Sequence, residues 1–330
     1  MAKSWLSTEI TILFSLAVFL IFSPAPVCAD EYQSWTGEFM RMGAGARAMG
    51  MGNAYTAVDG DIYSSYFNPA GLVSMKSRQM TFSFRQLSMD RRFKYFAIGS
   101  RIGPDADFAI SWLNVGTEDI TGRDLNGNPT ESLQDNRNSF TLTFSKYLTQ
   151  WLSLGLNTKL SYWKLADDDA KSFGFDLGVL ANPLRNLTAS FVLRDINSRF
   201  KWKSDRWKKT FSSSDSNGQT IEKEDKFPIY YTGGLAYRLF NKILLSSTVE
   251  YIEDNPLGLN AGVSYEFTER FTLRTGVYNY SSLDELNSES FTAGFTLRVS
   301  SSLNLDYAFA TDNADNDNIH IIAIVLGYGD

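Results

Sequence analysis

Residues 152–163 carry the sequence LSLGLNTKLSYW, in which apolar and polar side chains alternate one by one. Leu156 and Leu160 fall on one face of an extended chain, whereas Asn157 and Lys159 fall on the other. A period of two predicts a β-strand with one apolar and one polar face. The same alternation recurs from Gln79 to the C-terminus.

This rhythm predicts about fourteen strands, most of them near the roughly 9–11 residues that a tilted strand needs to cross a bilayer. No apolar run of spanning-helix length follows residue 30, and a closed antiparallel barrel is the other structure that satisfies backbone polar groups in lipid. We predict strands at residues 79–86, 93–101, 107–115, 137–147, 152–163, 172–182, 187–194, 229–239, 243–251, 258–267, 271–280, 290–299, 303–310 and 319–328.

The connections between these strands alternate in length. Short connections follow the even strands, whereas longer ones, such as 116–136, 164–171 and 195–228, follow odd strands. Membrane barrels have short periplasmic turns and longer extracellular loops, so both termini are expected on the periplasmic side. An exported β-propeller or sandwich is the soluble alternative. Charged side chains on the polar face should point into the lumen or lie at a rim: Arg85, Lys159, Asp176, Arg194, Glu250, Glu266, Arg274 and Arg298.

The first 77 residues differ from the rest of the chain. Residues 1–29 have the form of a signal peptide, with Lys3 before an apolar core and small residues around Cys28 at the expected cleavage site. Lipidation of Cys28 is the alternative. Residues 30–77 are rich in Gly and Ala, which predicts backbone packed tightly in a confined space, and a short helix at 61–67 should end before Pro69.

Composition and motifs argue against several kinds of site. The net charge of -6 gives no basic face for nucleic acid. The single histidine, His320, lacks the companions that a metal site or a catalytic triad needs, so we expect no metal, no cofactor and no enzyme activity. Asp124, Asn126 and Asn128 are spaced like the start of a calcium loop, although a plain Asn-Gly turn explains them better. The acidic stretch 312–317 could bind divalent cations or remain solvated.

The stretch 195–228 interleaves aromatic and cationic residues. Trp202, Arg206 and Trp207 are the candidate contacts for an external partner, because such residues can pair with lipopolysaccharide phosphates, acyl chains or a protein surface. The alternative is a β-extension of the barrel with a solvated face.

Two motifs point to a known family. GARAMGMGNAYTAV at 45–58, followed by FNPAGL at 67–72, resembles the PorV/PorQ family, a branch of the FadL-like outer-membrane proteins. The resemblance implies that residues 30–77 form a hatch that plugs the lumen of a barrel at 78–330. It also implies that Asn68, Pro69 and Ala70 position the hatch near a ligand route. A helix-terminating turn is the plainer explanation of that motif.

The resemblance implies a protein of the cell outer membrane, in contact with membrane lipid and lipopolysaccharide. PorV-like members assist type IX secretion, so the leading expectation is a component that binds and shuttles exported proteins. The alternative is FadL-like passive transport of hydrophobic compounds such as long-chain fatty acids. A porin-like barrel without specific cargo is the third possibility.

Overall fold

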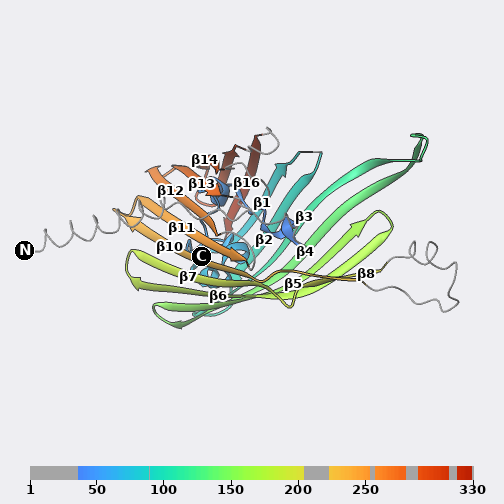
Figure 1. Ribbon diagram of the computed structural model, residues 1–330. Helices are drawn as coiled ribbons and strands as arrows, with labels where there is room; N and C mark the ends of the chain where they lie inside the picture. The colour runs from blue at the N-terminus through green and yellow to red at the C-terminus, as the bar shows by residue number, and fades with distance from the viewer. Residues whose placement is uncertain are drawn as a thin grey trace, which may run out of the picture. The chain divides into compact units, whose positions relative to one another are not determined.

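An antiparallel sheet that closes on itself forms the wall of the protein in the computed structural model (Figure 1). The described residues are 36–88, 90–203, 223–252, 257–279, 289–311 and 318–328. The predicted signal peptide at 1–29, the residues Arg206 and Trp207, and the acidic stretch 312–317 lie outside them. Gln33–Asp330 form one compact unit.

Sixteen strands are assigned in the described residues, and all but β8 and β9 belong to the closed wall, which therefore has fourteen. Each is antiparallel to its neighbours, and the β1–β16 pair closes the ring. The predicted barrel is confirmed. The wall strands are β1 (Arg78–Gln86), β2 (Arg92–Arg101), β3 (Ala106–Arg123), β4 (Pro129–Thr149), β5 (Leu152–Leu165), β6 (Asp168–Leu184), β7 (Leu187–Ile196), β10 (Tyr230–Leu239), β11 (Ile243–Ile252), β12 (Gly258–Thr268), β13 (Phe271–Asn279), β14 (Glu289–Arg298), β15 (Leu303–Ala310) and β16 (Ile319–Tyr328).

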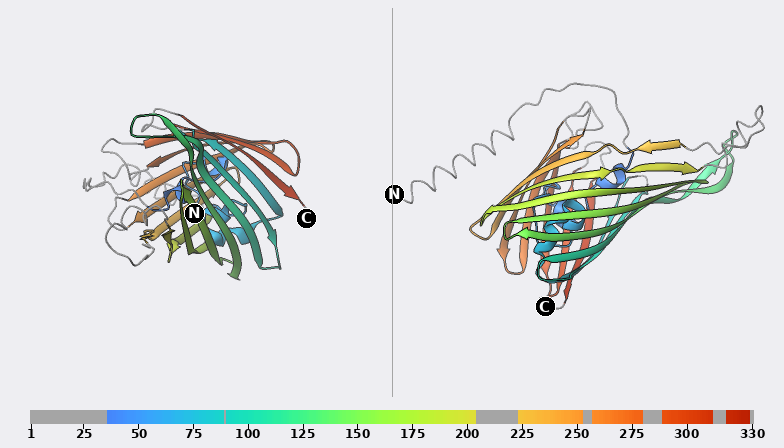
Figure 2. Two further views of the ribbon diagram at one scale, coloured as in Figure 1. Left: turned by 90° about the vertical axis from the view of Figure 1, so that its right-hand side faces the viewer. Right: turned by 90° about the horizontal axis from the view of Figure 1, so that it is seen from below.

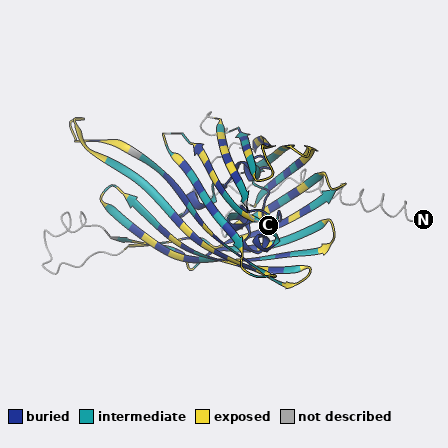
Figure 3. Cartoon of the chain, turned by 180° about the vertical axis from the view of Figure 1, so that it is seen from behind, coloured by how far each residue is buried: buried dark blue, intermediate teal, exposed yellow. Residues whose placement is uncertain are grey.

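Buried and exposed residues alternate along the wall strands (Figure 3); many of the exposed ones are large and apolar and many of the buried ones are polar, the reverse of a water-soluble protein. Phe140 and Leu142 are exposed, whereas the alternating Thr141 and Thr143 are buried against the interior. Such a surface suits a hydrocarbon solvent, since exposed leucine and phenylalanine are stable there and the polar side chains find partners within the lumen. The predicted inward charges Arg85, Lys159, Asp176 and Arg194 are buried, while Glu266 and Arg298 lie exposed near strand ends.

Two predicted loops are wrong. Residues 116–136 are mostly strand, because β3 and β4 continue as a tall hairpin and only 124–128 form the turn. Residues 164–171 likewise shorten to a turn at 166–167 between β5 and β6. Beyond the apolar belt both faces of a hairpin meet water, so the alternation that marks a strand disappears from the sequence although the backbone pairing continues.

The stretch predicted as the loop 195–228 contains two further strands. The pairing of β6 and β7 is interrupted by a bulge, after which β8 (Arg199–Lys203) pairs with β6 and β9 (Lys223–Lys226) pairs with β8. This is the β-extension that the sequence left as an alternative. It extends the wall beside the β5–β6 hairpin.

Residues 36–77, here called the N-terminal segment, lie inside the ring of strands (Figure 2). The segment contains four short helices: η1 (Glu38–Arg41), α2 (Ala46–Met49), α3 (Ser64–Phe67) and η2 (Pro69–Ser74). The helix predicted at 61–67 is found as α3, which ends before Pro69 as expected. Among the described residues, no helix is long and apolar enough to cross a membrane.

Candidate functional site

The Asn68-Pro69-Ala70 motif fastens the N-terminal segment to the wall. Asn68 is fully buried, and its Nδ2 donates to the carbonyl oxygens of Thr56 (3.1 Å) and Val179 in β6 (3.2 Å). Its Oδ1 accepts from the backbone N–H of Ala70 at 3.0 Å and so caps the start of η2. The backbone N–H of Asn68 thus ends α3 by donating to Ser64, while its side chain starts η2 and joins it to β6.

The wall is shaped to receive this motif. A Cβ at Gly155 would lie 2.2 Å from the backbone nitrogen of Ala70, and one at Gly178 would lie 2.2 Å from Asn68 Oδ1. Only glycine allows so close an approach. The hydroxyls of Ser145 and Ser153 donate to the Ala70 carbonyl at 3.0 and 2.9 Å. These contacts describe a structural anchor; the predicted role of the motif beside a ligand route stays a prediction.

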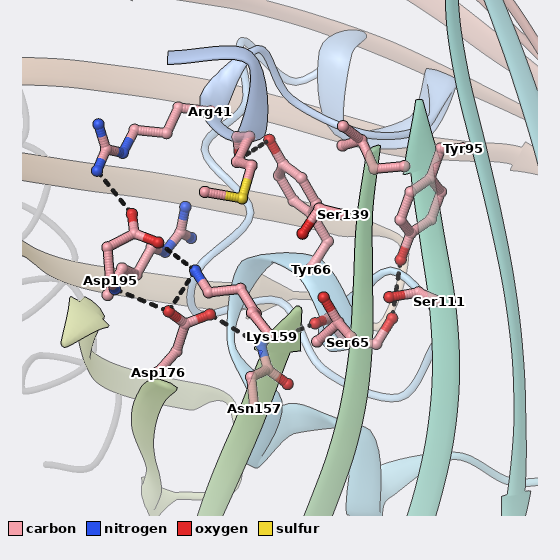
Figure 4. Close-up of a pocket in the computed structure, with 14 residues that line it drawn as sticks. Arg41, Ser65, Tyr66, Tyr95, Ser111, Ser139, Asn157, Lys159, Asp176 and Asp195 are labelled. Atoms are coloured by element: carbon pink, nitrogen blue, oxygen red, sulfur yellow. Dashed lines mark hydrogen bonds and ion pairs between the residues drawn. The ribbon is translucent and has the colours of Figure 1, made fainter. Parts of the chain in front are cut away.

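A cluster of buried ion pairs joins the N-terminal segment to β5, β6 and β7 (Figure 4). Arg41 of η1 pairs with Asp195 at 2.6 Å, and Lys159 bridges Asp176 at 2.6 Å and Asp195. All four side chains are at least nine-tenths buried. In such low-dielectric surroundings each charge depends on its partners, because removing one leaves another uncompensated.

Asp195 owes its inward position to the bulge in β7. Its φ of 62° is left-handed, and its backbone N–H donates to Asp176 Oδ1 at 2.9 Å. The sequence placed Lys159 and Asp176 on the inner face but missed Arg41 and Asp195. Asp195 directly follows Arg194, an inward residue, so strict alternation puts it outside. The bulge reverses that orientation.

A small polar cavity lies beside the ion pairs. Its volume is about 30 Å³, and besides the charged residues it is lined by side chains such as Tyr66, Tyr95, Ser111 and Ser139. An apolar cavity that holds benzene measures about 150 Å³. The cavity therefore has room for a few water molecules and none for an aromatic hydrocarbon.

A second group of charges surrounds Arg47 and joins α2 to β15. Arg47 of α2 lies 2.8 Å from Asp306 in β15 and 3.6 Å from Asp61. Asp61 also accepts the hydroxyl of Tyr55 at 2.6 Å. Burial raises the pKa of Asp61, and the guanidinium of Arg47 opposes that rise. The two carboxylates around one guanidinium hold α2 against the wall.

Aromatic rings pack between the ion pairs and the long β3–β4 and β5–β6 hairpins. Trp163 lies 4.9 Å from Trp202 and Phe200 lies 5.0 Å from Phe227, measured between ring centroids. Trp202, a predicted partner contact, is half-buried here and donates its indole N–H to Asp225 at 2.7 Å. Its proposed contact with an external partner stays a prediction.

A larger hollow opens at the end of the barrel that carries the short turns. It measures about 520 Å³ and is lined by Ala57, Val58 and Asp59 of the N-terminal segment, by the β6–β7 turn and by Arg238. The N-terminal segment thus lies inside the barrel between the packed aromatic rings and this hollow.

His320 and the 124–128 turn lie apart from these clusters. His320 lies on the outer face, where its Nδ1 is 2.8 Å from the hydroxyl of Tyr307. The Asp124 carboxylate accepts the backbone N–H groups of Asn126 and Asn128, each at 2.8 Å, so the tip is a self-contained turn around Gly127. In the described ranges, no group of three or more His, Cys, Asp or Glu is placed to hold a metal ion.

Solved structures with this fold are transport barrels. TbuX, a toluene transporter of Ralstonia pickettii, gives a TM-score of 0.60 at 12% identity and covers 87% of this chain and 99% of its own. TodX, a toluene transporter of Pseudomonas putida, gives 0.58 at 13%, with 86% and 96% covered. A FadL homologue of Pseudomonas aeruginosa gives 0.57 at 12%, with 86% and 98% covered.

These likenesses define the fold as an outer-membrane barrel of FadL type. No protein-family model matches the chain, and no curated protein matches it in sequence. The resemblance to the PorV/PorQ branch therefore stays a prediction.

Proposed function

We propose that this protein is a passive channel for small hydrophobic molecules in the outer membrane, with residues 30–77 as its hatch. The observation that supports the proposal is a FadL-like barrel fold with a segment inside it that ion pairs and hydrogen bonds join to the wall. The segment also packs in an apolar cluster that includes Ile62, Tyr95 and Leu113, so opening must break apolar contacts as well as these polar ones.

The proposed route runs from the aromatic rings at the tall hairpins to the hollow at the short turns. The half-buried rings of Trp163 and Trp202 offer an apolar surface to a ligand entering from outside. The cavity of about 30 Å³ is too small for such a ligand, so passage requires the segment to shift. The hollow beside Ala57 and Val58 would then receive the ligand on the periplasmic side.

The second candidate is a PorV/PorQ-type role in type IX secretion, in which the barrel binds and shuttles exported proteins. The motifs at 45–58 and 67–72 favour it, and so does the segment inside the barrel, since a shuttle needs no continuous path. Its partners would be secreted proteins or secretion components bound at the external hairpins.

Uptake measurements separate the two candidates. Cells that lack their own transporters would express the full chain, and uptake of labelled toluene and of a labelled long-chain fatty acid would be compared with cells expressing an unrelated barrel. The channel proposal predicts faster uptake of at least one compound. Uptake equal to the control, together with impaired secretion when residues 200–220 are deleted in the native organism, would favour the shuttle and contradict the channel.

A further inference from the structure

The outer face of the wall carries a groove where β7 gives way to β8. The groove has a volume of about 530 Å³ and is lined by Leu160, Phe173, Lys171, Asn197, Arg199 and Lys201, together with Ser172. The residues next to the two apolar ones, Lys159 and Ser172, are buried, whereas Leu160 and Phe173 are 56% and 43% exposed. The apolar part of the groove therefore faces outward, away from the lumen.

The groove lies at the edge of the apolar belt. Leu160 and Phe173 are the last aliphatic or phenyl side chains on the outer faces of β5 and β6 before the hairpin tip. The next outward residues are Tyr162 and Lys171, which lie opposite each other in the β5–β6 pair. A change from apolar to amphipathic and cationic side chains marks the depth at which hydrocarbon meets headgroups.

Cations gather above that floor, and the described residues balance their charge only in part. Lys171 and Lys201 are direct partners in the β6–β8 pair, and both are exposed. Like charges placed directly opposite are destabilising. Arg199 joins them on the same face of β8, and Asn197 Oδ1 accepts from its guanidinium at 3.0 Å.

A single carboxylate forms ion pairs with two of these three cations. Glu224 of β9 lies 3.1 Å from Lys201 and 3.2 Å from Arg199. Within the described part of the chain, no carboxylate lies within ion-pair distance of the Lys171 ammonium; the nearby Asp169 instead accepts the hydroxyl of Tyr162 at 2.6 Å. The groove therefore keeps a positive excess beside an apolar floor.

We propose that this groove binds a phosphorylated lipid of the extracellular leaflet. Its phosphate would lie between Lys171 and Lys201, where it relieves their repulsion, with Arg199 as a further donor. Its acyl chains would lie on Leu160 and Phe173. The inference rests on the barrel spanning a membrane and is independent of what the lumen transports.

The test measures binding of diphosphorylated lipid A to the purified full-length protein in detergent, by native mass spectrometry and thermophoresis. The variant K171Q/K201Q removes two cations and keeps a polar side chain that is one atom shorter at each position. At the strength that one cation typically contributes at an anionic membrane surface, its Kd should rise about 30-fold. The matched control is K146Q, an exposed lysine on β4 at the other edge of the belt, which should bind like the wild type.

Dephosphorylated lipid A is the second probe and should bind the wild type as weakly as phosphorylated lipid binds the double variant. Heat-modifiable gel migration shows that each variant is still a folded barrel. Equal affinity of wild type and double variant for lipid A would overturn the proposal. So would equal affinity of the wild type for the two lipids. Unchanged lipid binding combined with loss of a co-purifying protein would assign the groove to a protein partner instead.

Discussion

The N-terminal segment meets the barrel wall in two different ways. Toward β12 and β13 the contact is steric: a Cβ at Gly262 would lie 2.3 Å from the Met51 carbonyl oxygen, and one at Gly276 would lie 2.4 Å from the nitrogen of Gly52. Toward β5, β6 and β7 close packing at Gly155 and Gly178 is joined by buried ion pairs centred on Asp195, so that only this side depends on charge.

The difference indicates which side can open. Where the backbone packs directly against a glycine, the contact is either fully made or fully lost, and its strength does not depend on charge. Ion pairs can separate if water enters and solvates both partners. We therefore expect the segment to stay seated where it packs on glycine, while the ion pairs of Arg41 and Lys159 with Asp195 separate. Each prediction below changes one side and leaves the other intact.

The largest effect is expected on the electrostatic side. Asp195→Ala leaves Arg41 and Lys159 without their shared carboxylate, and breaking a buried ion pair in this way destabilises a protein by about 3–5 kcal/mol. Urea unfolding of the purified barrel in lipid vesicles measures the loss. Asp124→Ala, at an exposed hairpin tip, is the matched acidic control and should leave the unfolding midpoint unchanged. A midpoint for Asp195→Ala equal to that of the control would show that the cluster contributes nothing.

A somewhat smaller effect is expected on the steric side. Gly276→Val places a side chain against the backbone of Met51 and Gly52, and overpacking of this kind destabilises by up to about 3 kcal/mol. Gly233→Val is the matched control, because a Cβ there meets nothing within 4 Å. The same urea titration compares the two variants. If they unfold alike, the close packing of the segment against β13 is wrong.

The smallest effect is expected at the anchor motif. Asn68→Ala removes the cap of η2 and the bonds to Thr56 and Val179, which should lower the free energy of unfolding by about 1–2 kcal/mol. Asn68→Asp keeps the capping oxygen but turns a carboxylate oxygen toward the Thr56 and Val179 carbonyls in a fully buried site, so its loss should exceed that of Asn68→Ala. An unchanged midpoint for Asn68→Ala would leave the motif without a structural role.

Much of the fold could be predicted from the sequence, because a bilayer imposes strict alternation. Leu156 beside Asn157 is enough to place one residue in lipid and the other in the lumen. The tall β3–β4 hairpin could not be predicted, since residues 116–136 have no solvent contrast between their faces. A hairpin with both faces in water lacks the apolar–polar alternation of a strand, so its sequence resembles that of a loop.

The site was less predictable than the fold. Arg41 comes from a short helix and Asp195 from a bulge, and neither has a periodic signal that would aim it at the lumen. Lys159 was placed inward by alternation, yet its partners lie 17 and 36 residues away in sequence, as the Asp176 and Asp195 positions show. Contacts between segments so far apart depend on the register of the wall, which only the structure supplies.

The central claim is that the segment must shift for a hydrophobic molecule to pass, and a reversible cross-link tests it most directly. A Cβ built at Gly234 lies 3.2 Å from the Cβ of Ala57, near the separation that a disulfide spans. In the variant A57C/G234C, uptake of labelled toluene or fatty acid should stop when the disulfide forms and return on reduction, while each single variant behaves alike in both conditions. Undiminished uptake by the fully cross-linked protein would contradict the account.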